Sequence, residues 1–465
     1  MKDRIPILVV CALCLGLADS TFADEKAIVR AIERFFLVDD YDSKKSMVAE
    51  IERDEDYDPS RLNEWLHRAS LFAHHEPGVM MLDIVIDHGQ SREVLVRVPE
   101  LYDPSESWPM LYALHGSGSS HRAILQYVLN TFGHRIDEYI IVAPNEYRQT
   151  AMGEEGPPSI EHEAILQTLR TTFHLDNDRV FVTGYSKGGY TTWTLATLMP
   201  DRFAGAIPIA CSYSVLPYAE GLWETMLPNL KHVSILHCWG EDDQLPTLSL
   251  EGQEQGATIT QQNNFRLRPM TRIMGLTNIT HFQQTGTGHG GVIPRQADLE
   301  DLFRHTRTIA PHSILQKFRY VHQAQAYWLE GHRWRGKSWS PQSMPIQLRP
   351  DEDFGMALGR EVQSRLGELQ GEIEGQTIRI SQRHVGEMTL WIGDDMIEWD
   401  EPVKVMRNKS IVFEGHLERN LLVCLLQAQR TFDFDRLRWV GLRIRNSGKA
   451  RFVTGKTHIS TRGVK

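Results

Sequence analysis

Residues 180–189 are Val-Phe-Val-Thr-Gly-Tyr-Ser-Lys-Gly-Gly, and this stretch decides the fold class. An apolar run leads into Gly-x-Ser-x-Gly, and residues 190–199 contain no glycine or proline and carry apolar side chains at helical spacing. A turn this sharp needs neighbours with almost no side chain, which Gly184 and Gly188 provide around Ser186. The sequence therefore predicts a strand, a tight turn and a helix, with the Ser186 hydroxyl raised at the turn as a nucleophile.

Short apolar runs alternate with helical stretches on both sides of this motif, and a period-two pattern over residues 81–98 predicts an antiparallel hairpin before them. The predicted strands are residues 110–114, 139–142, 180–182, 204–210, 233–237 and 279–284. Strands that alternate with helices form a largely parallel sheet covered on both faces. The predicted fold class is therefore α/β, with ligands binding beyond the carboxyl ends of the strands.

The pattern changes on either side of this α/β region. Residues 24–76 have apolar positions at helical spacing, which predicts an N-terminal helical segment packed on the next domain. Residues 77–312 form the predicted α/β catalytic domain. Residues 313–465 contain alternating runs such as 373–380, 388–392, 403–406 and 411–413, with a tight turn at Asn408, and predict a β-rich accessory domain.

The first residues predict export. Lys2 and Arg4 precede the apolar run 5–17, and Thr-Phe-Ala at 21–23 offers small residues for a signal peptidase, so residues 1–23 are interpreted as a signal peptide. The apolar run is shorter than the ~20 residues that span a bilayer. We therefore expect no stable membrane span and a periplasmic or extracellular location.

Composition and motifs argue against several classes of partner. The net charge of −10 disfavours a nucleic-acid partner, which calls for a clustered basic face. His74-His75 and the acidic residues 241–243 lack the spacing of metal ligands, and no phosphate-binding glycine loop is present, so we predict no metal and no cofactor. The three cysteines outside the predicted signal peptide are Cys211, Cys238 and Cys424, and they are predicted to be buried free thiols.

A nucleophilic serine needs an imidazole base and a carboxylate that orients it, and in this topology they follow in the order Ser, acid, His. His289 is the preferred base, because it follows the last strand in a glycine-rich segment; His281 is the alternative. Asp243 is the preferred acid, with its neighbour Asp242 left open. Either carboxylate could instead cap the turn after its strand.

Acyl transfer also needs two N–H donors for the developing oxyanion. One is the backbone N–H of Lys187, the residue after the nucleophile. The other is assigned to Ser117 N–H, in Leu-His-Gly-Ser-Gly at 114–118, with Gly116 as the fallback.

The segments 114–116, 178–190 and 200–209 resemble those of the secreted α/β-hydrolase esterases. That group includes feruloyl and acetyl-xylan esterases, polyhydroxyalkanoate depolymerase-like proteins and predicted peptidases, and is related to prolyl oligopeptidase-type hydrolases. The resemblance covers about residues 76–312 and implies an α/β-hydrolase fold. The chain departs from the group at Trp239, where a histidine is usual, and at Pro246, whose spacing fits Asp242 better.

The expected function is that of an exported serine esterase, which cleaves a small-molecule or polysaccharide-linked ester through an acyl-enzyme. Two alternatives remain open: a serine peptidase, and a non-catalytic binding protein on the same fold. Residues 220–231 and 247–274 are the segments expected to shape the pocket. The sequence specifies neither the substrate-binding residues nor the oligomeric state.

Overall fold

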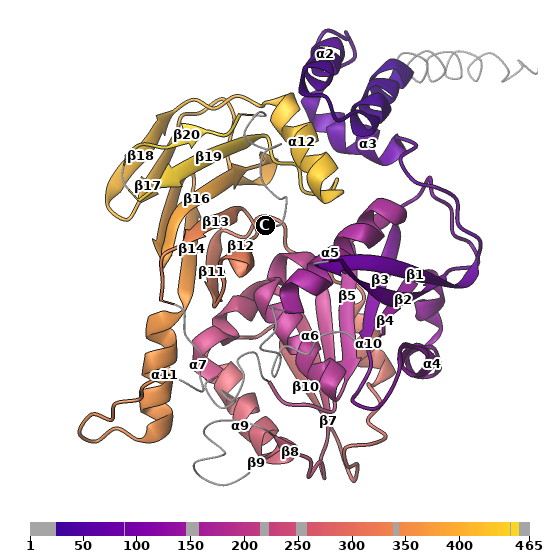
Figure 1. Ribbon diagram of the computed structural model, residues 1–465, viewed down its shortest axis with the longest axis vertical. Coiled ribbons are helices and arrows are strands. Elements are labelled where there is room, and N and C mark those ends of the chain that lie inside the picture. Colours follow the sequence, from indigo (N-terminus) through magenta and orange to yellow (C-terminus); the bar gives the residue numbers. More distant parts are fainter. Residues whose placement is uncertain are drawn as a thin grey trace, which may run out of the picture.

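The computed structural model describes residues 25–87, 89–145, 158–213, 223–247, 258–337, 344–446 and 448–454. Figure 1 shows a central sheet with flanking helices, a β-rich part formed by the C-terminal third, and helices from the N-terminal segment beside the latter. The predicted signal peptide, residues 1–23, lies outside the described residues. None of the helices in the described ranges has the length and hydropathy needed to cross a membrane.

The central sheet has eight strands in the order β1-β2-β4-β3-β5-β6-β7-β10. Only β2 runs against the others, because it pairs antiparallel with both β1 and β4 while all later neighbours are parallel. The strand bounds are β1 Gly78–Asp87, β2 Gln90–Val98, β3 Trp108–Leu114, β4 Ile140–Pro144, β5 Leu175–Tyr185, β6 Gly205–Ile209, β7 Ser234–Gly240 and β10 Ile279–Gln284. The predicted α/β-hydrolase fold and its leading hairpin are confirmed.

Helices cover both faces of this sheet (Figure 1). Alternate residues of each strand face opposite cores: Tyr112 and Val182 belong to one core, and Leu111 and Phe181 to the other. The first core includes side chains of α5 (Pro158–Thr172), α6 (Lys187–Leu198) and α9 (Thr260–Ile273), and the second those of α4 (His121–Thr131) and α10 (Gln296–Leu302). Because both faces are buried at the centre of the sheet, β3, β4 and β6 are almost continuously apolar.

The strand that precedes Ser186 is predicted at residues 180–182, but it begins earlier and includes the polar residues 176–179. They are the first half of β5. Two of their side chains accept hydrogen bonds from arginines elsewhere in the chain: Asp178 from Arg307 Nε at 2.9 Å, and Asn177 from Arg170 Nε at 3.0 Å. Partners that are distant in sequence therefore allow a polar segment to continue a strand.

The N-terminal segment packs mainly against the C-terminal domain, and not against the next domain along the chain as predicted. Its helices are residues 25–37, α2 (Tyr41–Ile51) and α3 (Leu62–Arg68), which share one core with the C-terminal strands. Phe36 makes edge contacts with Phe432 and Phe434, whose ring centroids lie 5.4 and 5.9 Å away. These helices lie beside α12 (Leu421–Thr431) in Figure 1. Complementary aromatic surfaces, which sequence order does not reveal, determine this packing.

The C-terminal domain contains two five-stranded sheets with a common core, in the orders β11-β14-β15-β17-β18 and β12-β13-β16-β19-β20. The strands are β11 Ser313–Phe318, β12 Gln325–Ala326, β13 Leu329–Trp334, β14 Gly367–Glu374, β15 Thr377–Arg383, β16 Val385–Ile392, β17 Val403–Arg407, β18 Ser410–Gly415, β19 Val440–Arg445 and β20 Arg451–Phe452. The predicted run 373–380 is two strands, because Gly375 adopts φ +54° and reverses the chain. The predicted turn at Asn408 is confirmed.

A buried charge cluster joins the C-terminal domain to the α/β domain. We use this name for Asp201, Arg202, Arg307, Asp433 and Arg436, all at most 9% exposed. Arg307 donates to both carboxylate oxygens of Asp433, at 2.8 and 2.6 Å, and Arg436 and Arg202 donate to Asp201 at 2.6 and 2.7 Å. Burial alone would raise the pKa of Asp201, but the two guanidinium groups hold it at about 2.

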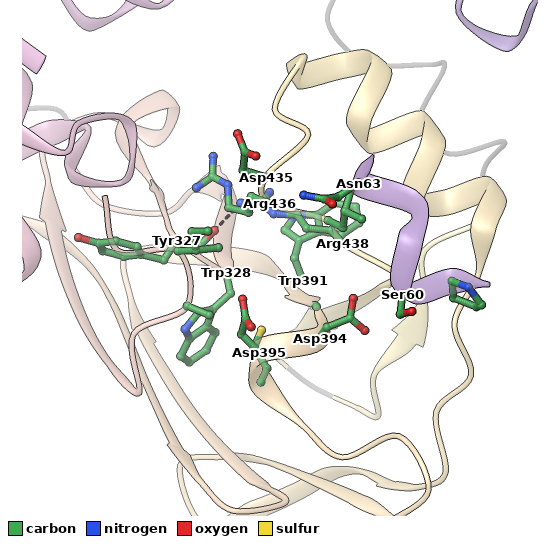
Figure 2. Close-up of a pocket in the computed structure, with 16 residues that line it drawn as sticks. Ser60, Asn63, Tyr327, Trp328, Trp391, Asp394, Asp395, Asp435, Arg436 and Arg438 are labelled. Atoms are coloured by element: carbon green, nitrogen blue, oxygen red, sulfur yellow. Dashed lines mark hydrogen bonds between the residues drawn. The ribbon is translucent and has the colours of Figure 1, made fainter. Parts of the chain in front are cut away.

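Three tryptophans of the C-terminal domain are buried within it. Trp328, Trp391 and Trp439 are at most 2% exposed, and their indole N–H groups donate to Pro311 O, Glu330 and Asp394 respectively. Trp328 and Trp391 help to line a cavity of about 190 Å³ between residues 59–63 and the C-terminal strands (Figure 2). None of the predicted site residues lines this cavity.

Among the described residues Cys211, Cys238 and Cys424 form no disulfide, and all three are buried, as predicted. Cys211 and Cys238 lie in the two cores of the α/β domain, and Cys424 lies in the core that the C-terminal strands share with the N-terminal helices.

Candidate active site

Ser186 occupies a strained turn between β5 and α6. Its backbone has φ 54° and ψ −114°, a conformation that non-glycine residues adopt rarely and at a cost of order 1–3 kcal/mol. Neighbouring chains approach so closely that a Cβ on Gly184 would lie 2.3 Å from the Gly188 carbonyl carbon, and one on Gly188 2.0 Å from Leu114 O. The two glycines of the motif are therefore required by backbone packing, as the sequence predicts.

His289 and Asp243 extend from Ser186 in a hydrogen-bonded chain. His289 Nε2 lies 2.9 Å from Ser186 Oγ, and His289 Nδ1 lies 2.9 Å from Asp243 Oδ2. The carboxylate of Asp243 can only accept, so Nδ1 carries the proton and Nε2 presents its lone pair to the serine hydroxyl. The arrangement can therefore take a proton from Ser186.

Exposure increases along this chain toward the nucleophile. The Asp243 side chain is fully buried, and the His289 side chain is 28% exposed. The second carboxylate oxygen of Asp243 accepts the backbone N–H of Leu245 at 3.1 Å. The carboxylate is thus held from both sides, while the serine end remains accessible.

The two adjacent aspartates at the end of β7 lie in different environments. Asp242 is exposed, and its backbone N–H donates to Thr287 O at 2.9 Å. Asp243 is the carboxylate that contacts His289. The structure therefore places the preferred aspartate, and not its neighbour, at the histidine.

The segment that carries His289 lies directly on the turn after β7. A Cβ on Gly240 would meet Thr287 O at 2.3 Å and Gly288 O at 2.4 Å, so this glycine permits the approach. Glu241 Oε2 accepts the N–H of Gly286 at 3.0 Å. No role was predicted for Glu241, which belongs to an acidic run without metal-ligand spacing. Its contact with Gly286 depends on the paired ends of β7 and β10.

His281, the alternative base, belongs to a different pair. Its Nδ1 lies 3.2 Å from Nδ1 of His237, and its Nε2 lies 3.0 Å from Thr271 Oγ1. Burial lowers the pKa of His281 to about 3 and that of His237 to about 4, so both stay neutral at ordinary pH. The structure does not bring His281 to Ser186.

The loop after β3 reaches the nucleophile from the other side. A Cβ on Gly116 would lie 3.5 Å from Ser186 Cβ, which places Gly116 and Ser117 beside the serine. Lys187 is the first residue of α6, next to Ser186 in the same turn. Both predicted sources of oxyanion donors therefore border Ser186.

Within the described ranges no three His, Cys, Asp or Glu side chains gather as a metal-ion site. Of the segments expected to shape the pocket, residues 223–226 and 260–273 are helical, and residues 248–257 lie outside the described residues.

Comparison with known families agrees with this geometry. Residues 87–273 match the family described as "Putative esterase". This part of the chain is therefore similar to esterases of that family. Ser186 and Asp243 lie within the match, and His289 follows it. The resemblance to α/β-hydrolase esterases, predicted from the sequence, is confirmed for this domain.

Two curated proteins that are similar to part of the chain carry related names. Over 123 residues the chain is 25% identical to a "Probable feruloyl esterase C" of Aspergillus terreus. The aligned region covers 24% of this chain and 43% of that protein. Over 120 residues it is 28% identical to "Feruloyl esterase D" of Neurospora crassa, which covers 23% and 41%. The chain therefore spans less than half the length of these relatives.

Among solved structures, the chain is similar to a thermostable esterase at 22% identity, with 49% of this chain and 63% of that chain covered and a TM-score of 0.36.

Proposed function

We propose that the protein is an exported serine carboxylesterase in which Ser186, His289 and Asp243 form a catalytic triad. The hydrogen-bonded chain from Ser186 Oγ through His289 to the buried Asp243 carries this proposal. It supplies a nucleophile, a base with its lone pair on the nucleophile, and a carboxylate that fixes the tautomer of the base.

In the acylation step, Ser186 Oγ attacks the ester carbonyl carbon while its proton passes to His289 Nε2. The carbonyl oxygen of the tetrahedral intermediate carries the negative charge, which the N–H groups of Ser117 and Lys187 stabilise. The bond from carbon to the alcohol oxygen then breaks, and His289 returns the proton to the departing alkoxide. The acyl group remains on Ser186.

In the deacylation step, water replaces the alcohol. His289 takes a proton from the water as the water attacks the acyl carbon, and returns it to Ser186 Oγ when the acyl-oxygen bond breaks. Asp243 remains ionised throughout and stabilises the transient imidazolium. The products are a carboxylic acid and the free enzyme.

The proposed substrate is an acyl group on a polysaccharide or a similar plant-derived ester. The names of the curated relatives, both feruloyl esterases, support this class. Export to the periplasm or the medium is proposed on the charged and apolar pattern of residues 1–23.

The test is pre-steady-state kinetics of residues 24–465 on p-nitrophenyl acetate and on a matched p-nitroanilide, with Ser186→Ala as control. We expect a stoichiometric burst of p-nitrophenol that the variant lacks, and slow or absent anilide cleavage. Comparable anilide cleavage would instead indicate a peptidase. Absence of Ser186-dependent turnover on both substrates and on a feruloylated oligosaccharide would contradict the proposal.

A further inference from the structure

The residue before the nucleophile contacts the loop that carries the proposed base. The Tyr185 hydroxyl donates to His289 O at 2.7 Å and accepts the N–H of Val292 at 3.2 Å. It therefore binds the His289 loop, residues 285–293, at the backbone of His289 itself and again at Val292, three residues further along. One side chain thus links the backbone of the nucleophile to the backbone of the base.

A second tyrosine supports this contact from α4. The Tyr127 hydroxyl donates to Val292 O at 2.7 Å, and its ring meets that of Tyr185 edge-on with centroids 5.3 Å apart. Within the described part of the chain, Tyr127 forms neither a hydrogen bond nor a ring contact with Ser186 or His289. It fixes the far end of the loop and one face of Tyr185.

The loop itself is poorly suited to hold the imidazole without such contacts. Residues 285–291 are Thr-Gly-Thr-Gly-His-Gly-Gly, and glycine has the largest backbone freedom to lose on ordering. Gly286 and Gly291 adopt φ +62° and +86°. Side chains outside the loop must therefore fix the backbone of His289.

We propose that Tyr185 is a positioning residue that sets the distance between His289 Nε2 and Ser186 Oγ by binding the loop at His289 and Val292. The inference rests on the proposed esterase function. Tyr185 does not contact the reacting atoms; it acts through the placement of His289. Tyr127 is its supporting residue, with a smaller effect.

The protonation state of the tyrosine suits this role. Burial raises the pKa of the Tyr185 hydroxyl, and hydrogen bonds from the loop N–H groups offset only part of that rise. The hydroxyl therefore remains a donor to His289 O over the whole range in which His289 can act as a base. A phenylalanine at this position would keep the ring contacts and lose both hydrogen bonds.

The test compares Tyr185→Phe with Tyr127→Phe as the matched control, since each change removes one hydroxyl from the same aromatic pair. For Tyr185→Phe we expect kcat on p-nitrophenyl acetate to fall 10–100-fold with KM within twofold, because the chemical step and not binding is impaired. For Tyr127→Phe we expect a loss of kcat below fivefold. A kcat for Tyr185→Phe within twofold of wild type, in a protein with native circular dichroism, would overturn the proposal.

Hydrogen exchange, followed by mass spectrometry, tests the positioning role without any substrate. We expect peptides that cover residues 285–293 to exchange at least tenfold faster in Tyr185→Phe, with peptides of β5 and α6 unchanged. Unchanged exchange in the loop would refute the role of Tyr185 even if the wild-type enzyme is active. Faster exchange in the loop, together with a wild-type protein that turns over no ester, would support the contact and contradict the esterase function alone.

Discussion

The proposed triad of Ser186, His289 and Asp243, called the corner below, and the buried charge cluster both place a buried carboxylate against nitrogen donors from distant parts of the chain. At the corner, Asp243 meets His289, and the chain ends at a hydroxyl that is partly exposed. In the cluster, Asp433 meets Arg307 and Arg436, and all three side chains are at most 9% exposed.

The difference lies in where each network ends. Each carboxylate of the cluster is paired with two guanidinium groups, so removal of one guanidinium leaves a buried carboxylate whose charge is only partly compensated. The corner ends at an accessible serine whose backbone is strained. A buried carboxylate that is paired only with guanidinium groups therefore serves to join the two domains. A buried carboxylate whose hydrogen-bonded chain ends at an accessible hydroxyl is suited to catalysis.

The largest expected effect is on catalysis, from Asp243→Asn. The asparagine amide can favour the wrong tautomer of His289, so we expect kcat to fall by about 10³–10⁴-fold with little change in stability. Asp242→Asn is the matched control one residue away, with an exposed side chain, and should stay within twofold. Steady-state kinetics on p-nitrophenyl acetate decides; equal losses in both variants would contradict the assignment of the acid.

The second effect is on stability, from Arg307→Met. This change leaves Asp433 buried without its bidentate partner, and we expect the free energy of unfolding to fall by about 3–5 kcal/mol. Arg34→Met is the control, because Arg34 pairs with Glu50 at the surface, where both side chains are more than half exposed. That change should cost less than about 1 kcal/mol.

The same variants also separate the two regions functionally. Folded Arg307→Met protein should keep the kcat of wild type within twofold, as measured below the onset of its thermal unfolding. A selective loss of kcat in the fully folded variant would show that the cluster affects the corner, and would contradict the independence of the two regions.

A smaller effect is the pH dependence of stability at His67, where the N-terminal helices, the α/β domain and the C-terminal domain meet. His67 Nε2 lies 2.9 Å from Asp435 Oδ1, and His67 Nδ1 lies 2.9 Å from His174 Nε2. His174 Nδ1 lies 3.0 Å from Pro104 O, which can only accept, so a neutral His174 must accept from His67. His67 therefore donates from both nitrogens and is charged.

The pKa of His67 agrees with this protonation. Burial lowers it, but the hydrogen bond and charge of Asp435 outweigh burial and raise it above the ordinary value. A raised pKa means that the contribution to stability is present below about pH 6.5 and is lost as the pH rises through the folded-state value. Unfolding titrations of wild type and His67→Gln should therefore differ by about 1 kcal/mol at pH 6 and converge at high pH. A difference that grows with pH would contradict the charged state.

The corner was largely predictable from sequence because its key features are local. The Gly-x-Ser-x-Gly motif between a strand and a helix identifies Ser186, and chain order with a glycine setting selects His289 over His281. The choice between Asp243 and Asp242 was open, because adjacent side chains diverge and only the geometry of the turn after β7 determines which one faces the histidine.

The buried charge cluster could not be predicted from the sequence, because its contacts join residues that lie far apart in the chain. Arg307, Asp433 and Arg436 each resemble a solvated surface charge in sequence, and only the docking of the C-terminal domain buries them together. The N-terminal helices show the same limit: their apolar faces were apparent, but not the partner of Phe36. Tyr185 and Tyr127 carry no sequence signal for their contacts with the loop, since these depend on the position of Val292.

The most direct test of the triad is the site and rate of labelling by a fluorophosphonate, followed by peptide mass spectrometry. The account predicts one equivalent of label on Ser186, with labelling at least 10³-fold slower in His289→Ala and absent in Ser186→Ala. Label on another residue, or labelling of Ser186 that is as fast without His289, would contradict it.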